Sequence, residues 1–271
     1  MLAQVHRRRV LVARSPVATA ADAAATTAFL ARTSGLDATH TNAYKALING
    51  LVSDGVWAKL DLLQIYATQD ATTALLNLVS TSYPATVSGS PTFTADGGYT
   101  TASGKYIDTG FAFNAGVNYT QNAASLLVWS GSNVAAATNN KILTSAAAFN
   151  GSANLQPRSS TDVAVLLLND TSAITSPANT DGSGFYAGIR TNSTTKQLWK
   201  DGVQMGGDIT RASVALQAVN LQTGGNNAVA SNAYAGIVRA VGAGGTLSAG
   251  DNANLYAHLR TYMTAIGVTG N

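Results

Sequence analysis

From Tyr83 to about residue 245 the sequence has no helical periodicity, and this feature constrains the fold more than any other. Short apolar or alternating runs recur there, and clusters of Gly, Asn, Ser and Asp separate them. Many short strands without helices between them predict an antiparallel β-sandwich. The predicted strands are Lys105–Thr109, Ala124–Trp129, Lys141–Ser145, Val163–Leu168, Gly184–Arg190, Lys196–Trp199, Ala215–Leu221 and Ala233–Ala240.

One turn in this region is more specific than the others. Asp201 and Gly202 stand between two strand-like flanks, and an Asp-Gly pair in that setting favours a two-residue β-hairpin. The sequence therefore predicts that the segments on either side of this pair are neighbouring antiparallel strands.

The chain before Tyr83 has a helical pattern. The segment Ala18–Arg32 is rich in alanine, which favours a helix, and a third short helix is expected over Ala71–Val79. Between them, Asp37 or Thr39 can cap a helix whose apolar residues recur on one face and which ends near a glycine. That face consists of Tyr44, Leu47, Ile48, Leu51 and Val52, and the glycine is Gly55.

The end of the chain is helical again. Ser248 and Asp251 have the spacing of a capping box, and Gly267 is placed to end the helix. The apolar residues between them share one face, so we expect this helix to dock on the sandwich. They are Leu255, Leu259, Tyr262, Met263 and Ile266.

Composition excludes several kinds of chemistry. The 271 residues include no cysteine, and all 13 acidic residues are aspartate, so disulfides, thiolate metal sites and every mechanism that needs a glutamate are absent. Charged residues make up only 11% of the chain, and the net charge of +3 is too small to indicate a nucleic-acid-binding protein. No apolar run is long enough to span a bilayer, so no membrane partner is expected.

The positive charge is concentrated at the N-terminus, in Arg7, Arg8, Arg9 and Arg14. The apolar run that Arg14 interrupts is too short for a secretory signal. Such a basic arm is either a solvated tail or an anchor, and docking on an acidic protein surface is a simpler interpretation than binding nucleic acid, because no aromatic residues are interleaved with the arginines.

Four segments of the sandwich region resemble the concanavalin A-like lectin/glucanase (laminin G-like) jelly roll. They are Gly184–Arg190, Lys196–Val203 with its Asp-Gly turn, Leu221–Gly225 with its paired glycines, and Ala235–Val238. The segments 43–51, 54–61 and 89–93 resemble proteins of tailed phages and prophages in which helices precede such a sandwich, and the closing helix is similar to that of virus-associated members. The resemblance covers about residues 37–266.

The resemblance implies a mainly β protein: a jelly-roll β-sandwich preceded by an N-terminal helical region and closed by a C-terminal helix. The predicted division is an anchoring arm with an Ala-rich segment at 1–36, a helical region at 37–82, and the sandwich with its helix at 83–271.

Enzymatic activity is not expected. Glycosidases use paired carboxylates, and the nearest aspartate pairs here, Asp201 with Asp208 and Asp162 with Asp170, lie in turn-like segments. The three histidines are widely separated, no serine has the Gly-x-Ser-x-Gly context of a nucleophile, and the glycine-rich loops lack the Lys-Ser/Thr of a phosphate cradle.

Binding residues are predicted for a glycan and, less specifically, for calcium. Trp129, Tyr186 and Trp199 are aromatic candidates for glycan contact, with Asn192 as a polar partner. Core packing is the default for each aromatic because it lies on a predicted strand, and Trp199 is the best candidate for exposure because it precedes the hairpin tip. No cofactor other than Ca²⁺ is expected. Lectin-like members of this fold often hold Ca²⁺ through carboxylate and amide oxygens, for which the candidates are Asp96, Asp108, Asn114, Asp181 and Asn192.

These observations predict a non-enzymatic structural protein of a tailed-phage or phage-like virion, in the form of a fibre, spike, neck or capsid-decoration component. The N-terminus would bind other virion proteins, and the sandwich would attach to host-surface glycans, with a trimer favoured because repeated weak contacts gain through avidity. The alternative is a free carbohydrate-binding module or a degenerate glycoside hydrolase.

Overall fold

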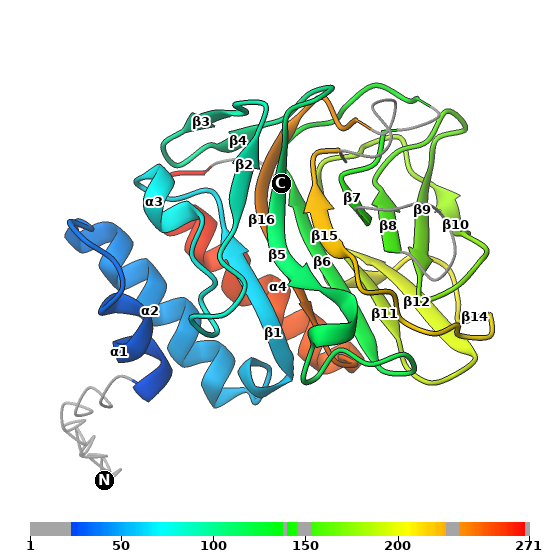
Figure 1. Ribbon diagram of the computed structural model, residues 1–271, viewed down its shortest axis with the longest axis horizontal. Helices are drawn as coiled ribbons and strands as arrows, with labels where there is room; N and C mark the ends of the chain where they lie inside the picture. Colours follow the sequence, from blue (N-terminus) through cyan, green and yellow to red (C-terminus); the bar gives the residue numbers. More distant parts are fainter. Residues whose placement is uncertain (1–22, 138–139, 146–152, 226–232, 269–271) are drawn as a thin grey trace, which may run out of the picture.

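The structure, a computed structural model, describes residues 23–137, 140–145, 153–225 and 233–268. In this part of the chain the strands form a nine-stranded and a seven-stranded sheet, and every pair of neighbouring strands is antiparallel. The two sheets pack face to face, so the predicted antiparallel β-sandwich is confirmed (Figure 1).

The nine-stranded sheet, which we call sheet A, contains the strands nearest to the helices. Its members are β1 (Leu60–Ile65), β3 (Thr92–Thr94), β4 (Gly98–Thr100), β6 (Ala124–Ser130), β11 (Gly184–Arg190), β12 (Thr195–Lys200), β13 (Val203–Gln204), β14 (Ile209–Thr210) and β16 (Ile237–Gly244). The strand order is β13-β12-β11-β6-β16-β4-β3, with β1 paired to β16 and β14 paired to β12.

The seven-stranded sheet, sheet B, forms the other layer. Its strands are β2 (Thr86–Ser88), β5 (Tyr106–Ala112), β7 (Leu143–Ser145), β8 (Ala153–Gln156), β9 (Val163–Leu168), β10 (Ile174–Ala178) and β15 (Asn220–Thr223). They follow the order β10-β9-β8-β7-β15-β5-β2, so strands that are distant in sequence, such as β7 and β15, lie side by side.

The described helices are α1 (Ala24–Leu30), α2 (Ala38–Ser53), α3 (Ala71–Ala74) and α4 (Ala249–Ala265), with short 3₁₀ turns η1 (Trp57–Lys59) and η2 (Phe113–Ala115). Of these, α1, α2 and α4 lie together on the outer side of sheet A (Figure 1). Asp37 caps α2 by accepting the backbone N–H of His40, and the predicted capping box of α4 is present between Ser248 and Asp251. No helix in the described residues is long and apolar enough to cross a bilayer.

Sheet A is buried on both faces because it separates two apolar cores. Along β6, Leu126 and Val128 point into the core between the sheets, whereas Leu127 and Trp129 point into the core under the helices. Every residue of β6 and β11 is therefore buried, although neighbouring side chains point in opposite directions. The N-terminal and C-terminal helices thus cover the outer face of the same sheet.

Several sequence predictions match the structure closely. The bounds of β9 and β11 are those predicted, and the Asp201-Gly202 hairpin joins β12 to β13, with Lys200 opposite Val203. Both turn residues have positive φ, 50° at Asp201 and 79° at Gly202, which explains why this dipeptide suits the turn.

Other predictions need correction. The helix predicted over Ala71–Val79 ends at Ala74, because Asn77 bonds through its side chain to the backbone of Asp61 and Leu63 instead of continuing the helix. The strand predicted over Ala215–Leu221 begins only at Asn220, and Leu216 and Val219 pack against the core from a loop.

Two further segments differ from the sequence interpretation. The segment Ala18–Arg32 is helical over Ala24–Leu30 within the described residues. Residues 37–82, interpreted as helical, also contain β1, which pairs with β16 and so belongs to the sandwich.

Candidate functional site

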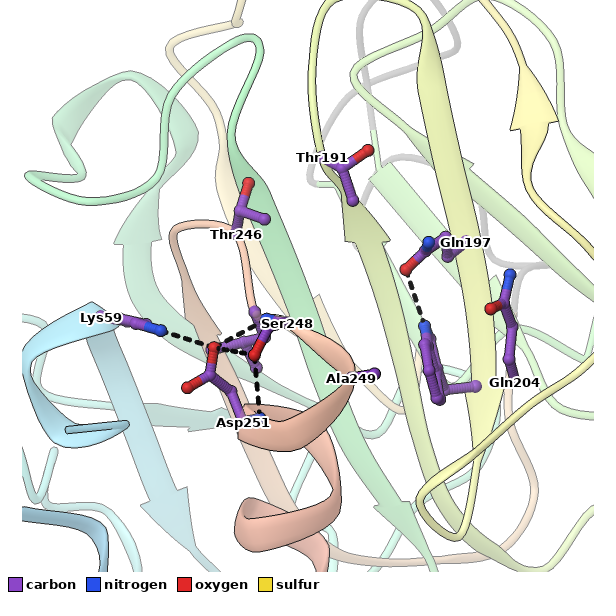
Figure 2. Close-up of a pocket in the computed structure, with 10 residues that line it drawn as sticks. Lys59, Thr191, Gln197, Gln204, Thr246, Ser248, Ala249 and Asp251 are labelled. Carbon is purple, nitrogen blue, oxygen red and sulfur yellow. Dashed lines mark hydrogen bonds and ion pairs between the residues drawn. The ribbon is translucent and has the colours of Figure 1, made fainter. Parts of the chain in front are cut away.

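A pocket of about 340 Å³ lies where the N-terminus of α4 meets β12 and β13, on the outer face of sheet A. Figure 2 shows an ion pair on one side and two glutamines on the opposite side. The walls come from four separate parts of the chain. The lining residues are Lys59, Thr191, Gln197, Trp199, Gln204, Thr246, Leu247, Ser248, Ala249 and Asp251.

The charged side of the pocket is built on the cap of α4. Oδ2 of Asp251 lies 2.5 Å from Nζ of Lys59 and accepts hydrogen bonds from the backbone N–H and the hydroxyl of Ser248, both at 2.7 Å. Burial acts to raise the pKa of Asp251, but the hydrogen bonds from Lys59 and Ser248 outweigh it and lower the pKa below its ordinary value. The carboxylate is therefore ionised at neutral pH and already partnered.

The opposite side presents two side-chain amides held in place by Asp208. The Nε2 groups of Gln197 and Gln204 donate to Oδ1 of Asp208, at 2.7 and 2.9 Å, and the indole N–H of Trp199 donates to Oε1 of Gln197 at 3.2 Å. Each amide nitrogen carries two N–H groups, so each keeps one donor after this bond. The pocket thus has preorganised polar groups with hydrogen-bonding capacity to spare.

Two threonines complete the rim between these sides (Figure 2). Thr246 donates its hydroxyl hydrogen to the carbonyl of Arg190 at 2.7 Å, which leaves its oxygen as an acceptor. Trp199 is 7% exposed, so it contributes only a small apolar surface next to Leu247 and Ala249. The arrangement can hydrogen-bond a small polar ligand and pack against one apolar face of it.

Of the four predicted glycan-binding residues, only Trp199 lines this pocket. Trp129 is fully buried and stacks on Tyr256, 5.9 Å between ring centroids, so it is unavailable to a sugar in this structure. Tyr186 is also fully buried; its hydroxyl accepts from Asn179 at 2.9 Å and donates to a backbone carbonyl, and burial raises its pKa. Asn192 is exposed in the turn between β11 and β12, where its side chain accepts the backbone N–H of Thr194 and is used to form the turn.

The predicted metal ligands occupy separate parts of the fold. Asp96 lies 2.7 Å from ring Nε2 of His40, Asp108 accepts from Asn220 and from the backbone N–H of Gly110, and Asp181 accepts from Ser183. Across the described ranges, no three histidine or aspartate side chains gather in a way that could hold a metal ion. Asn114 lies in η2, the 3₁₀ turn that follows β5.

The arginines predicted to anchor the chain, Arg7, Arg8, Arg9 and Arg14, lie outside the described residues.

Sequence reasoning did not find most of the pocket. Gln197 and Gln204 flank the predicted hairpin, and the register that pairs Trp199 with Gln204 could have placed them together. Lys59 carries no local signal, because it reaches the pocket through an ion pair with Asp251, 192 positions later. The capping box itself was visible in the sequence, but nothing in its spacing shows that it borders a pocket.

No protein-family model matches the sequence, and no curated protein matches it significantly. Solved structures show a shared fold. Domain 4 of an extracellular GH43 arabinanase from Geobacillus stearothermophilus, solved in complex with arabinotriose, is 15% identical with a TM-score of 0.50, and the match covers 73% of this chain and 98% of that one.

In two further similar structures, the match covers only part of the solved chain. The binding domain of botulinum neurotoxin serotype D is 13% identical with a TM-score of 0.52, over 74% of this chain and 52% of that one. A sialidase from Trypanosoma rangeli, solved with sialic acid, is 11% identical with a TM-score of 0.56, over 80% of this chain and 39% of that one. At these identities the likeness establishes the fold: the chain is built on a β-sandwich that it shares with these domains.

Proposed function

We propose that this chain is a non-enzymatic carbohydrate-binding protein that serves as an attachment component of a tailed-phage or phage-like virion. The pocket between α4 and the β12–β13 hairpin is the observation that carries the binding role, since it joins oriented amides, hydroxyls and a tryptophan edge. The similarity to an arabinanase domain solved with arabinotriose and to a sialidase solved with sialic acid supports this role.

The composition of the pocket supports binding without catalysis. Glycoside hydrolysis needs two carboxyl groups on either side of the scissile bond, one of them able to donate a proton. The pocket is lined by a single carboxylate, Asp251, whose lowered pKa and bonds to Lys59 and Ser248 suit a structural role.

The virion role rests on the sequence. The segments at 43–51, 54–61 and 89–93 resemble tailed-phage proteins, and four arginines stand within the first 14 residues. The proposal is that the N-terminal arm binds other virion proteins, that the protein self-associates, with a trimer favoured, and that the sandwich projects toward host-surface glycans. A free carbohydrate-binding module is the second candidate, because the pocket is compatible with it equally.

Sugar binding can be tested with the full chain on a glycan array, followed by calorimetric titration with the best ligand. Gln197→Ala and Gln204→Ala are each expected to weaken binding about tenfold, because each removes a preorganised hydrogen bond. Gln217→Ala, at a partly exposed glutamine outside the pocket, is the matched control and is expected to leave binding unchanged. Equal losses in all three variants, or no binding to any sugar, would contradict the proposal.

The virion role requires a separate test. When particles assembled with the full-length chain are purified, the protein is expected to co-sediment with them. Deleting residues 1–22 removes the basic arm and leaves α1 and all later elements in place, and it is expected to abolish incorporation. Incorporation that survives this deletion, or a chain that never sediments with particles, would favour the free carbohydrate-binding module.

A further inference from the structure

We propose that the pocket selects neutral saccharides and excludes acidic ones. This inference rests on the proposed carbohydrate-binding function and assigns the ligand class of the same site. The ligand is a terminal pentose or hexose unit without a carboxylate.

The charges around the pocket carry the first part of the argument. Lys59 is the only cation among the lining residues, and Asp251 lies 2.5 Å from it. A second carboxylate, Asp208, is held close to the pocket because it accepts a hydrogen bond from each of the two glutamine amides. One lysine therefore faces two aspartates, and the carboxylate of an acidic sugar would enter a region of net negative charge.

Three other cations of sheet A point away from the pocket. Arg190 and Lys196 are both fully buried and lie 3.6 and 2.7 Å from Asp170. Arg190 donates to the carbonyl of Leu168 in β9, a strand of sheet B. Its guanidinium therefore points to the inner face of sheet A, away from the pocket. Lys200 lies over the ring of Tyr186, which belongs to the core between the sheets.

The remaining hydrogen-bonding capacity favours hydroxyl groups. Gln197 and Gln204 each keep an amide N–H and carbonyl lone pairs, while Thr246 offers an acceptor. A sugar hydroxyl donates and accepts at once, so it can satisfy such a mixed set. A carboxylate only accepts, so it would leave the amide and hydroxyl acceptors of the pocket without a donor.

The size and apolar surface of the pocket suit a single ring. Its volume of about 340 Å³ is at the small end of the roughly 300–1,000 Å³ usual for small-molecule sites. The small exposed edge of Trp199, with Ala249, matches the C–H face of one sugar ring. The neighbouring units of a longer chain would extend into solvent.

The test compares saccharides that differ in charge and little else. The full chain is titrated by calorimetry with arabinotriose, with galactobiose against digalacturonate, and with lactose against sialyllactose. Within at least one pair the neutral member is expected to bind at least about tenfold more tightly, and added salt is expected to narrow the gap. Equal or tighter binding of the acidic members would overturn the selectivity while leaving carbohydrate binding intact; failure of every sugar would overturn both.

Two variants test the electrostatic cause. Asp208→Asn removes a negative charge but keeps the oxygen that accepts from both glutamines, and Thr191→Lys adds a cation at the rim without touching the cap of α4. Each is expected to lower the ratio of neutral to acidic affinity within a pair several-fold, because the acidic member gains more from the added positive or removed negative charge. Asp162→Asn, at an aspartate paired with Arg158 outside the pocket, is the matched control. Unchanged discrimination in both pocket variants would show that charge does not cause it.

Discussion

At the scale of single residues, the most informative side chains are polar ones whose partners lie far away in sequence. His40 shows this clearly: its two ring nitrogens contact Asp37 at 2.8 Å and Asp96 at 2.7 Å, so it joins the start of α2 to the turn between β3 and β4. A neutral imidazole can donate through only one nitrogen, so both contacts are satisfied as hydrogen bonds to carboxylates only when the ring is protonated.

This contact predicts a pH dependence of stability. Burial acts to lower the pKa of His40, but the bonds and charges of Asp37 and Asp96 outweigh it and raise the pKa above its ordinary value of 6.5. Because the folded pKa is the higher one, the stabilisation is complete below the unfolded pKa and is lost as the pH rises through the folded pKa. In urea unfolding between about pH 6 and 9, the stability difference between wild type and His40→Gln is expected to shrink with rising pH; a constant difference would contradict this.

A second prediction at this scale concerns the cap of α4. Ser248→Ala removes the hydroxyl that accepts the backbone N–H of Asp251 at 3.1 Å and donates to its carboxylate. The free energy of unfolding is expected to fall by about 0.5–2 kcal/mol, the usual cost of losing such a cap. Ser160→Ala, at an exposed serine, is the control. A loss no larger than that of the control in thermal unfolding would show that the cap is dispensable.

At the scale of elements, close approach between the sheets depends on glycine at one position of β11. Gly188 lies against Leu166 of β9, and a Cβ added at this position would overlap the leucine side chain. Its φ is not positive, so the backbone conformation is open to any residue, and space alone excludes a larger one.

Gly188→Ala is therefore expected to destabilise the protein by about 1–3 kcal/mol through overpacking. Gly207→Ala is the matched control, since nothing lies within 4 Å of the added Cβ. In a Leu166→Ala background the same substitution is expected to be neutral or stabilising, because the space is then free. Denaturant unfolding of the four-membered cycle measures this; additive losses would contradict the contact.

The elements also show what the sequence could and could not predict. Local chemistry determined the best predictions: the Asp201-Gly202 hairpin and the capping box at Ser248 depend on neighbouring residues alone. The strand β1 was not predicted, because its partner β16 lies far along the chain and all six of its residues are buried, so its apolar and polar residues do not alternate. The pocket was missed for the same reason, apart from Trp199, because Lys59 and Asp251 meet only through tertiary structure.

At the scale of the whole molecule, sheet A is shared by two cores. Its inner face packs against sheet B, and its outer face packs against α2 and α4. The helices at the two ends of the described chain therefore pack on the same strands as the sandwich. Loss of sheet A would expose both cores to solvent.

This arrangement predicts a single cooperative unfolding transition for the described fold. Leu126→Ala, in the core between the sheets, and Leu259→Ala, in the core under the helices, are each expected to cost about 2–5 kcal/mol. Both variants are expected to shift the same calorimetric peak to lower temperature. Two separate peaks, each sensitive to only one variant, would mean that the helical layer and the sandwich unfold independently.

The ion pair between Lys59 and Asp251 spans 192 positions of the chain, and it forms one wall of the pocket. A sugar seated there would act as a brace between early and late segments, so that unfolding must first release it. At a hundred times its dissociation constant, such a ligand adds about 2.7 kcal/mol to the stability of the folded state. Glycan binding would therefore stabilise the folded protein, and a rise in its melting temperature would identify a bound sugar without any label.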